Sequence, residues 1–232
     1  MVGDRGVLGI GMVGYAFMGR AHPQAWRNVA SFFDLPLRPR MAAICAHAVD
    51  LAQHLAGDRI AGVSALTETF VRERPLVGGG GARGPVTVDD AALFVGRFAG
   101  GALGSFEATR CAAGHTEGLS VEVNGELGSI AWELGALNEL RLFDGREEPA
   151  TQGFRRIQVT RAGHPYAGAW WPDGHTIGYE HTFTHEVRDL LWAIADGRDP
   201  VPSFADGLQV PEVLDAVQRS AASSSSWTQV ER

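Results

Sequence analysis

The sequence predicts a βαβ unit at the start of the chain, followed by an α+β domain with a mainly antiparallel, open-faced sheet and C-terminal helices. Two observations predict this. An apolar, glycine-interrupted run near the N-terminus opens into a helical pattern, and short strand-like runs then follow one another with turn residues between them. Strands joined by short turns make antiparallel sheets, whereas a strand-helix-strand unit makes a parallel pair.

In the first unit, Val7–Val13 is a predicted buried strand, Met18–Ala30 a helix and Arg40–Cys45 a second, parallel strand. The apolar positions of Ala46–Ala56 have helical spacing, and Gly57 is placed to end that helix. A strand that enters a helix directly at Cys45–Ala46, with no turn residue, is unusual. We therefore expect a discontinuity at this junction.

Strand-like runs fill the middle of the chain. They are Ile60–Arg72, Val86–Phe98, Ala102–Arg110, Leu119–Val123, Ser129–Leu134, Leu140–Phe143 and Phe154–Thr160. Leu119–Val123 and Ser129–Leu134 alternate apolar and polar residues around Asn124-Gly125, which predicts a hairpin. The runs together predict an antiparallel sheet.

Two apolar stripes with helical spacing close the chain. The first, which starts at Phe183, ends at Gly197, and Pro211 delays or kinks the second, which includes Val213 and Val217. The predicted organisation is a βαβ unit over residues 1–45, an α+β domain over residues 46–222, and a polar tail over residues 223–232.

Composition narrows the function classes. The net charge is -7 and there is no Lys/Arg-rich run of five or more residues, which argues against a nucleic-acid partner. No stretch reaches the roughly 18 apolar residues of a membrane span, and the N-terminus lacks a signal-peptide pattern. Cys45 and Cys111 have no paired spacing, so we expect reduced thiols. A cytoplasmic protein with a small-molecule partner is expected.

All 20 Lys and Arg residues are arginine. The sequence is rich in Ala and Gly, which is consistent with a compositional bias as the general cause of the missing lysine. Any mechanism that needs a lysine is nevertheless excluded for this chain.

Two glycine patterns compete as the phosphate-binding turn. Gly9–Gly14 matches G-x-G-x-x-G but lies inside the expected strand, whereas Gly14–Gly19 ends that strand and opens the helix. The context favours the second pattern, although Ala16 replaces its middle glycine. It predicts cofactor contacts from Gly14, Ala16, Phe17, Met18 and Gly19, and a plain structural turn is the alternative.

With this turn, GMVGYAFMGRAHPQAW resembles the start of the Gfo/Idh/MocA family of NAD(P)-dependent oxidoreductases. AHAVDLAQHLAG resembles that family's G-x-H-x-x-D helix, and the segment from GYEHTFTHEV to QVPEVLDAV resembles its C-terminal helices. The resemblance implies a Rossmann cofactor domain that binds NAD or NADP, hydride transfer from a sugar- or inositol-like alcohol, and catalytic roles for His47 and Asp50.

The departures from the family are equally specific. At about 30 residues per βαβ unit, a complete Rossmann domain cannot fit before Cys45, so the chain resembles a family member with an internal deletion joined there. The resemblance thus implies a truncated dinucleotide-binding domain over residues 1–45 and an α+β substrate or oligomerisation domain over residues 46–222. The Glu-Lys-Pro segment with its catalytic lysine has no counterpart, and Ala43 stands where the family has an aspartate. We therefore expect little turnover from this shortened chain.

His47 matches the proton-transfer histidine of the family, and Asp50 lies one helical turn further, where it could orient the imidazole. The alternative is a solvated helix face shared by His47, Asp50 and His54. A metal site is not expected, because three ligands spread over two turns diverge too far.

A second cluster is rich in aromatic and imidazole groups: Trp170, Trp171, His175, Tyr179, His181 and His185. Aromatic faces pack on the C–H surfaces of sugars while His and Tyr bond hydroxyls, so we expect substrate contacts from His181 foremost, and from Tyr179, Trp171 and His175. The alternative is a packed loop with buried tryptophans. Glu107 and Arg110 are further candidates.

Two other functions stay open. One is a catalytically inert structural protein that forms a homo-oligomer through the sheet face left exposed by the missing domain. The other is a bare nucleotide- or anion-binding module that uses only the helix N-terminus.

Overall fold

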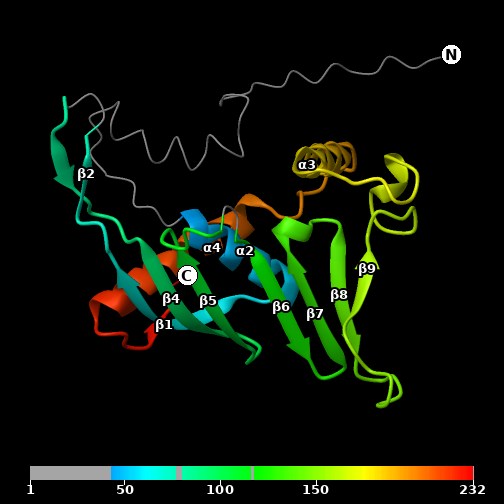
Figure 1. Cartoon of the computed structure of the whole chain (residues 1–232), viewed down its shortest axis with the longest axis horizontal. Coiled ribbons are helices and arrows are strands. Elements are labelled where there is room, and N and C mark those ends of the chain that lie inside the picture. Colours follow the sequence, from blue (N-terminus) through cyan, green and yellow to red (C-terminus); the bar gives the residue numbers. More distant parts are fainter. Residues whose placement is uncertain (1–42, 77–79, 116–117, 232) are drawn as a thin grey trace.

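The computed structural model describes residues 43–76, 80–115 and 118–231. It contains two four-stranded antiparallel sheets, with helices against one face of the first (Figure 1). The predicted α+β class with an antiparallel sheet and C-terminal helices is confirmed. The glycine-rich turn, with Gly14, Ala16, Phe17, Met18 and Gly19, lies outside the described residues, as does most of the predicted βαβ unit.

Helix α2 spans Ala43–Ala56. The strand predicted over Arg40–Cys45 is therefore wrong for its last three residues, which are helical. The sequence has no glycine or proline on either side of Cys45–Ala46, and alanine has the highest helix propensity. The helix therefore runs through the expected junction. Gly57, with φ of 60°, ends it as predicted.

The first sheet, sheet I, has the strand order β10-β1-β4-β5. Its strands are β1 (Ile60–Glu68), β4 (Ala91–Phe98), β5 (Leu103–Thr109) and β10 (Thr228–Gln229). Helices α2 and α4 cover one face, where Val49, Val63, Phe94 and Val213 form the centre of the core (Figure 1). Alternate residues of the strands leave Leu66, Leu93 and Val95 exposed on the other face.

Helix α4 (Phe204–Ala222) contains Pro211, and its start is capped by Ser203, whose hydroxyl accepts from the N–H of Asp206 at 3.3 Å. The segment after α4, residues 223–232 of the predicted tail, returns to sheet I in its described part. The Ser64 hydroxyl donates to the carbonyl of Ser225 at 2.6 Å, and β10 pairs with β1. Trp227 lies against Gly62, where a Cβ would meet the indole at 2.5 Å.

The predicted run Ile60–Arg72 ends early, because the chain leaves sheet I after Glu68 to form a projecting hairpin of β2 (Glu73–Pro75) and β3 (Arg83–Pro85) (Figure 1). Asp90 holds its base. The buried carboxylate accepts from the N–H of Val71 at 2.8 Å and from Nη2 of Arg74 at 3.0 Å. The bond from Val71 and the charge of Arg74 lower the pKa of Asp90.

The second sheet, sheet II, has the order β6-β7-β8-β9. Its strands are β6 (Ser120–Gly125), β7 (Gly128–Glu133), β8 (Glu139–Asp144) and β9 (Arg155–Gln158). The predicted β6–β7 hairpin is confirmed, but Gly125 pairs with Gly128, so the loop is Glu126-Leu127 rather than Asn124-Gly125. Gly128 is needed in the strand because a Cβ there would meet the carbonyl oxygen of Phe143 at 2.2 Å.

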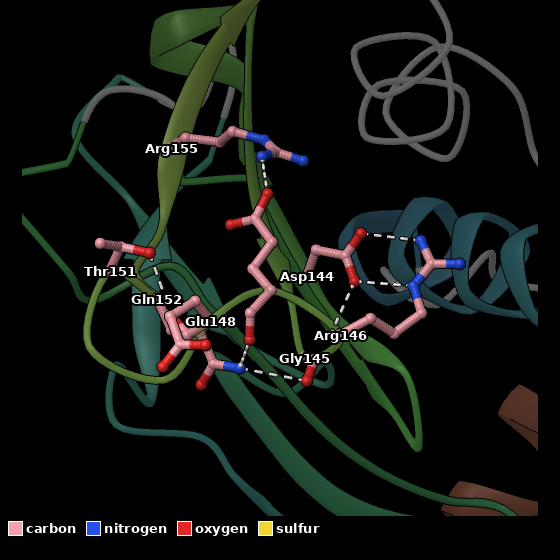
Figure 2. Close-up of polar contacts among 8 residues, drawn as sticks. Asp144, Gly145, Arg146, Glu148, Thr151, Gln152 and Arg155 are labelled. Atoms are coloured by element: carbon pink, nitrogen blue, oxygen red, sulfur yellow. Dashed lines mark hydrogen bonds and ion pairs between the residues drawn. The ribbon is translucent and has the colours of Figure 1, made fainter.

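Figure 2 shows how the connection from β8 to β9 is held. Asp144 accepts from Nε and Nη2 of Arg146, at 2.8 and 2.7 Å. The Gln152 amide donates to the carbonyl of Gly145 at 3.1 Å, and Arg155 pairs with Glu147. These contacts bind the loop to itself and to Arg155, the first residue of β9, which pairs with β8.

Helix α3 spans Tyr179–Ala195 and is followed by Gly197 with φ of 64°, as predicted. It lies apart from the core of sheet I (Figure 1). Of its residues only Ala193 is buried. Its large apolar side chains are exposed: Phe183, Val187, Leu190, Leu191, Trp192 and Ile194. No helix in the described ranges is long and apolar enough to cross a membrane.

Candidate functional site

Trp170 is the centre of a ring cluster formed by the segment between β9 and α3 together with the first turns of α3. Its indole meets the imidazole of His181 edge-on at 4.4 Å between centroids. It also contacts Trp171 at 6.2 Å and His185 at 5.8 Å. The short 3-10 helix Ala167–Ala169, whose Ala167 is buried, places Trp170 here.

His185 is held on both sides. Its Nε2 accepts a hydrogen bond from the indole N–H of Trp170 at 2.7 Å, and its ring stacks on Tyr166 at 4.4 Å with an interplanar angle of 15°. Burial of the imidazole and the nearby His181 lower the pKa of His185. His185 is therefore a neutral imidazole with its proton on Nδ1.

Tyr166 has a left-handed backbone, with φ of 64°, which is uncommon for an aromatic residue. Its hydroxyl donates to Oδ2 of Asp189 at 2.5 Å, and Arg188 lies over its ring at 5.4 Å. The bond to the carboxylate raises the pKa of Tyr166 and lowers that of Asp189. These contacts join the segment before α3 to the middle of the helix, at Arg188 and Asp189.

His181 occupies the third position of α3, and its side chain is only 13% exposed. Its Nδ1 accepts from the backbone N–H of Gly178 at 3.1 Å. This is the position from which a glutamate or glutamine side chain often reaches back to the start of a helix. The bond uses one ring nitrogen and leaves Nε2 for another partner.

The other predicted substrate residues are more exposed. Trp171 is 50% exposed and meets His181 edge-on at 6.2 Å. His175 turns its Nδ1 to the carbonyl of Pro172 at 3.0 Å. Tyr179 contacts Phe183 at 5.3 Å. Trp171 and His181 are thus in direct ring contact, while His175 and Tyr179 flank them in the chain.

His47 and Asp50 lie on the exposed face of α2, opposite the buried Val49 and Gln53. Within the described ranges, no side-chain hydrogen bond, ion pair or ring contact joins either residue to the Trp170 cluster. No group of three or more metal-ligating side chains is found in the same ranges. The structure therefore does not link the predicted acid/base pair to the predicted substrate cluster.

Glu107 and Arg110 belong to other surroundings. Glu107 is exposed on β5 and lines a shallow hollow over sheet I together with Leu66, Leu93 and Ser105. The backbone N–H of Arg110 donates to the carbonyl of Asp90 at 2.8 Å, at the base of the projecting hairpin.

Sequence reasoning missed Tyr166 and Asp189, which are 23 residues apart and meet through one hydrogen bond. It also missed Asn138, whose carboxamide donates to and accepts from the backbone of Ile177. The spacing of His181 and His185 on one helix face was visible, but nothing in the sequence marked their distant partners.

Comparison with known proteins decides the family. The sequence model described as the GFO/IDH/MocA C-terminal domain matches residues 11–131, which is more than half of the chain. The chain belongs to the Gfo/Idh/MocA family. The matched range crosses the boundary that we place after Cys45.

Several known proteins are similar to this chain. Levoglucosan dehydrogenase of Pseudarthrobacter phenanthrenivorans is 39% identical over 220 residues, which cover 90% of this chain and 55% of that protein. An oxidoreductase domain protein from Kribbella flavida is 54% identical, with a TM-score of 0.77 over 82% of this chain and 49% of that chain. A levoglucosan dehydrogenase in complex with NADH and L-sorbose is 39% identical, with a TM-score of 0.76 and the same coverage. The chain thus spans about half the length of these relatives.

Proposed function

We propose that this chain carries the substrate side of a Gfo/Idh/MocA oxidoreductase that acts on a sugar- or inositol-like alcohol with NAD or NADP. The observation that supports this most directly is the contact of Trp170 and Trp171 with the imidazole of His181. Apolar ring faces beside a few hydrogen-bonding groups suit a polyol, whose C–H and O–H groups alternate. Relatives that are named for levoglucosan or were solved with L-sorbose support the same substrate class.

In this proposal the exposed indole of Trp171 covers the C–H face of the ligand. His181, His175 and Tyr179 supply hydrogen bonds to its hydroxyl groups. Because the pKa of His185 is lowered, this imidazole is neutral and adds no formal charge beside His181. The ligand is then recognised by shape and hydrogen bonds, with no formal charge required.

For catalysis we propose His47 as the group that takes the hydroxyl proton and Asp50 as the residue that orients it. Hydride transfer would use NAD or NADP bound at Gly14, Ala16, Phe17, Met18 and Gly19. We also propose that an internal deletion, joined near Cys45, connects the truncated cofactor domain of residues 1–45 to the domain of residues 46–222. Because the chain has no lysine and carries Ala43 in place of the family's aspartate, we expect turnover to be lower by a factor of roughly 10² to 10⁴ for each missing group.

Calorimetric titration with levoglucosan tests substrate binding. We expect measurable heat with the wild-type chain and loss of that heat in Trp171→Ala. Trp192→Ala is the matched control, because Trp192 is 55% exposed on α3, close to the 50% of Trp171. Equal binding by both variants, or no binding by the wild type, contradicts the proposed substrate site.

A separate titration tests the cofactor. We expect NADH or NADPH fluorescence to change on addition of the chain at millimolar cofactor, and Gly14→Val to abolish the change. An unchanged cofactor spectrum with the wild type rejects the cofactor assignment for this chain while leaving the sugar-binding result independent.

A second candidate function has its own observation. The uncovered face of sheet I exposes Leu66, Leu93, Val95 and Leu103, and apolar patches of this kind often mark association surfaces. On this alternative the chain is an inert structural protein that pairs through the sheet. Light scattering should then show a dimer that Val95→Asp converts to a monomer, and a monomeric wild type contradicts it.

A further inference from the structure

Asn138 joins sheet II to the segment that carries the ring cluster. It lies directly before β8, and its carbonyl accepts from the N–H of Val159 at 2.9 Å. Its carboxamide Nδ2 donates to the carbonyl of Ile177, and its Oδ1 accepts from the N–H of the same residue, both at 2.9 Å. Within the described ranges, the hydrogen bonds found between residues 161–178 and the segment that begins β8 are these two.

These two hydrogen bonds act on His181 through the next peptide group. Ile177 precedes Gly178, whose N–H donates to Nδ1 of His181 at 3.1 Å. A ring nitrogen that accepts an N–H carries no proton itself, so a neutral His181 has its proton on Nε2. Asn138 therefore fixes the peptide that selects the tautomer of His181.

Glu180 competes for the same nitrogen. Its Oε1 lies 3.4 Å from Nδ1 of His181 and would favour a proton there. A proton on Nδ1 would, however, face the N–H of Gly178, and the Glu180 side chain is 79% exposed, so that water screens its charge. The bond from Gly178 is shorter and backbone-held, and it decides the tautomer.

The neighbouring imidazoles have the opposite tautomer. Nδ1 of His175 lies 3.0 Å from the carbonyl of Pro172, which can only accept, so this nitrogen carries the proton. His185 accepts from Trp170 through Nε2 and therefore also has its proton on Nδ1. Of these three rings, His181 offers an Nε2–H donor and His175 leaves its Nε2 as an acceptor.

We propose that Asn138 is a positioning residue that holds His181 in the Nε2–H tautomer, so that His181 donates a hydrogen bond to a substrate oxygen. The identity of the acceptor as a sugar hydroxyl rests on the function proposed above. The tautomer and its dependence on Asn138 do not.

Nitrogen-15 NMR of the imidazole rings in the full chain tests the tautomer directly. At neutral pH we expect His181 to have a protonated Nε2 and an unprotonated Nδ1, with the signal assigned by its loss in His181→Gln. In Asn138→Ala we expect this preference to shift toward the mixture of tautomers of a free imidazole, while His175 keeps Nδ1–H. Asn124→Ala is the matched control, because Asn124 lies on β6 of the same sheet and bonds to Glu122.

Asn138→Asp separates the two bonds. The introduced carboxylate still accepts from the N–H of Ile177 but repels its carbonyl, so we expect a shift of the same sign as in Asn138→Ala. A protonated Nδ1 on wild-type His181 overturns the proposal, because it means that the pair with Glu180 prevails. A His181 tautomer unchanged in Asn138→Ala, in a protein whose remaining spectrum is native, overturns it as well.

The ligand step has its own measurement. Titration with levoglucosan should give a Kd about fivefold higher in Asn138→Ala than in Asn124→Ala, the cost of one misplaced hydrogen bond. An equal Kd contradicts the role of the donor in binding. If the tautomer shifts as expected and levoglucosan does not bind the wild type, the positioning role stands and the proposed substrate fails.

Discussion

The indole N–H of Trp170 donates to Nε2 of His185 across 2.7 Å. The same imidazole stacks on Tyr166. The hydrogen bond requires an unprotonated Nε2, so the contact joins the conformation of the segment before α3 to the protonation state of one side chain.

The first prediction concerns pH. Because the pKa of His185 is lowered in the folded chain, its contribution to stability is full above the ordinary histidine pKa of about 6.5. As the pH falls below that value, the unfolded state binds the proton first and folding loses free energy until the pKa of the folded state is passed. Urea unfolding at pH 7.5 and pH 5.5 should show a larger loss for the wild type than for His185→Gln. His54→Gln, at an exposed position of α2, should behave like the wild type, and equal losses in all three chains would count against the lowered pKa.

The second prediction separates the two uses of His181. Glutamine at the third helix position can keep the bond to the start of α3, so His181→Gln should lose only the ring contacts and lower the urea midpoint less than His181→Ala. His181→Ala removes both the cap and the ring contacts, at a cost of about 1 to 2 kcal/mol. Both variants should lose levoglucosan binding. Retained binding in His181→Gln would show that the imidazole is not the recognising group.

The third prediction concerns the start of α4. The Ser203 hydroxyl accepts from the N–H of Asp206, and Ser203→Ala leaves that donor without its cap. We expect a loss of about 1 kcal/mol in the free energy of unfolding. Ser105→Ala, at an exposed position on β5, should change it by less than about 0.5 kcal/mol. A chemical denaturation series compares the two, and equal effects would exclude the cap as the cause.

The fourth prediction contrasts two valines in the C-terminal helices. Val213 of α4 is fully buried against sheet I, whereas Val187 of α3 is 51% exposed. Val213→Ala should lower the free energy of unfolding by about 2 to 3 kcal/mol through lost burial and a cavity. Val187→Ala should be nearly neutral in the isolated chain. A large cost at Val187 would contradict its exposed position and would mean that α3 is covered in solution.

The hairpin of β6 and β7 could be predicted because its alternation is a local pattern, and α3 and α4 because their apolar spacing and end residues are local too. The prediction for Arg40–Cys45 failed at its described end, because a short apolar run suits a strand and a helix equally, and the adjoining Ala46–Ala56 extended the helix. The prediction placed the hairpin loop two residues too early. The sequence shows Gly125 and Gly128 alike, and only the contact with Phe143 on another strand shows that Gly128 belongs to the strand.

Of the candidate site, the sequence by itself indicated the cluster of Trp170, Trp171 and His181, because these residues lie close together along the chain. The tertiary structure decided the rest. Asn138 meets Ile177 across 39 residues, and Gly62 pairs with Gln229 from the far end of the chain. Periodicity records which side of an element is apolar, but not which distant element meets it. Only the folded chain shows that Asn138, before β8, bonds to Ile177, which directly precedes the N–H that contacts His181.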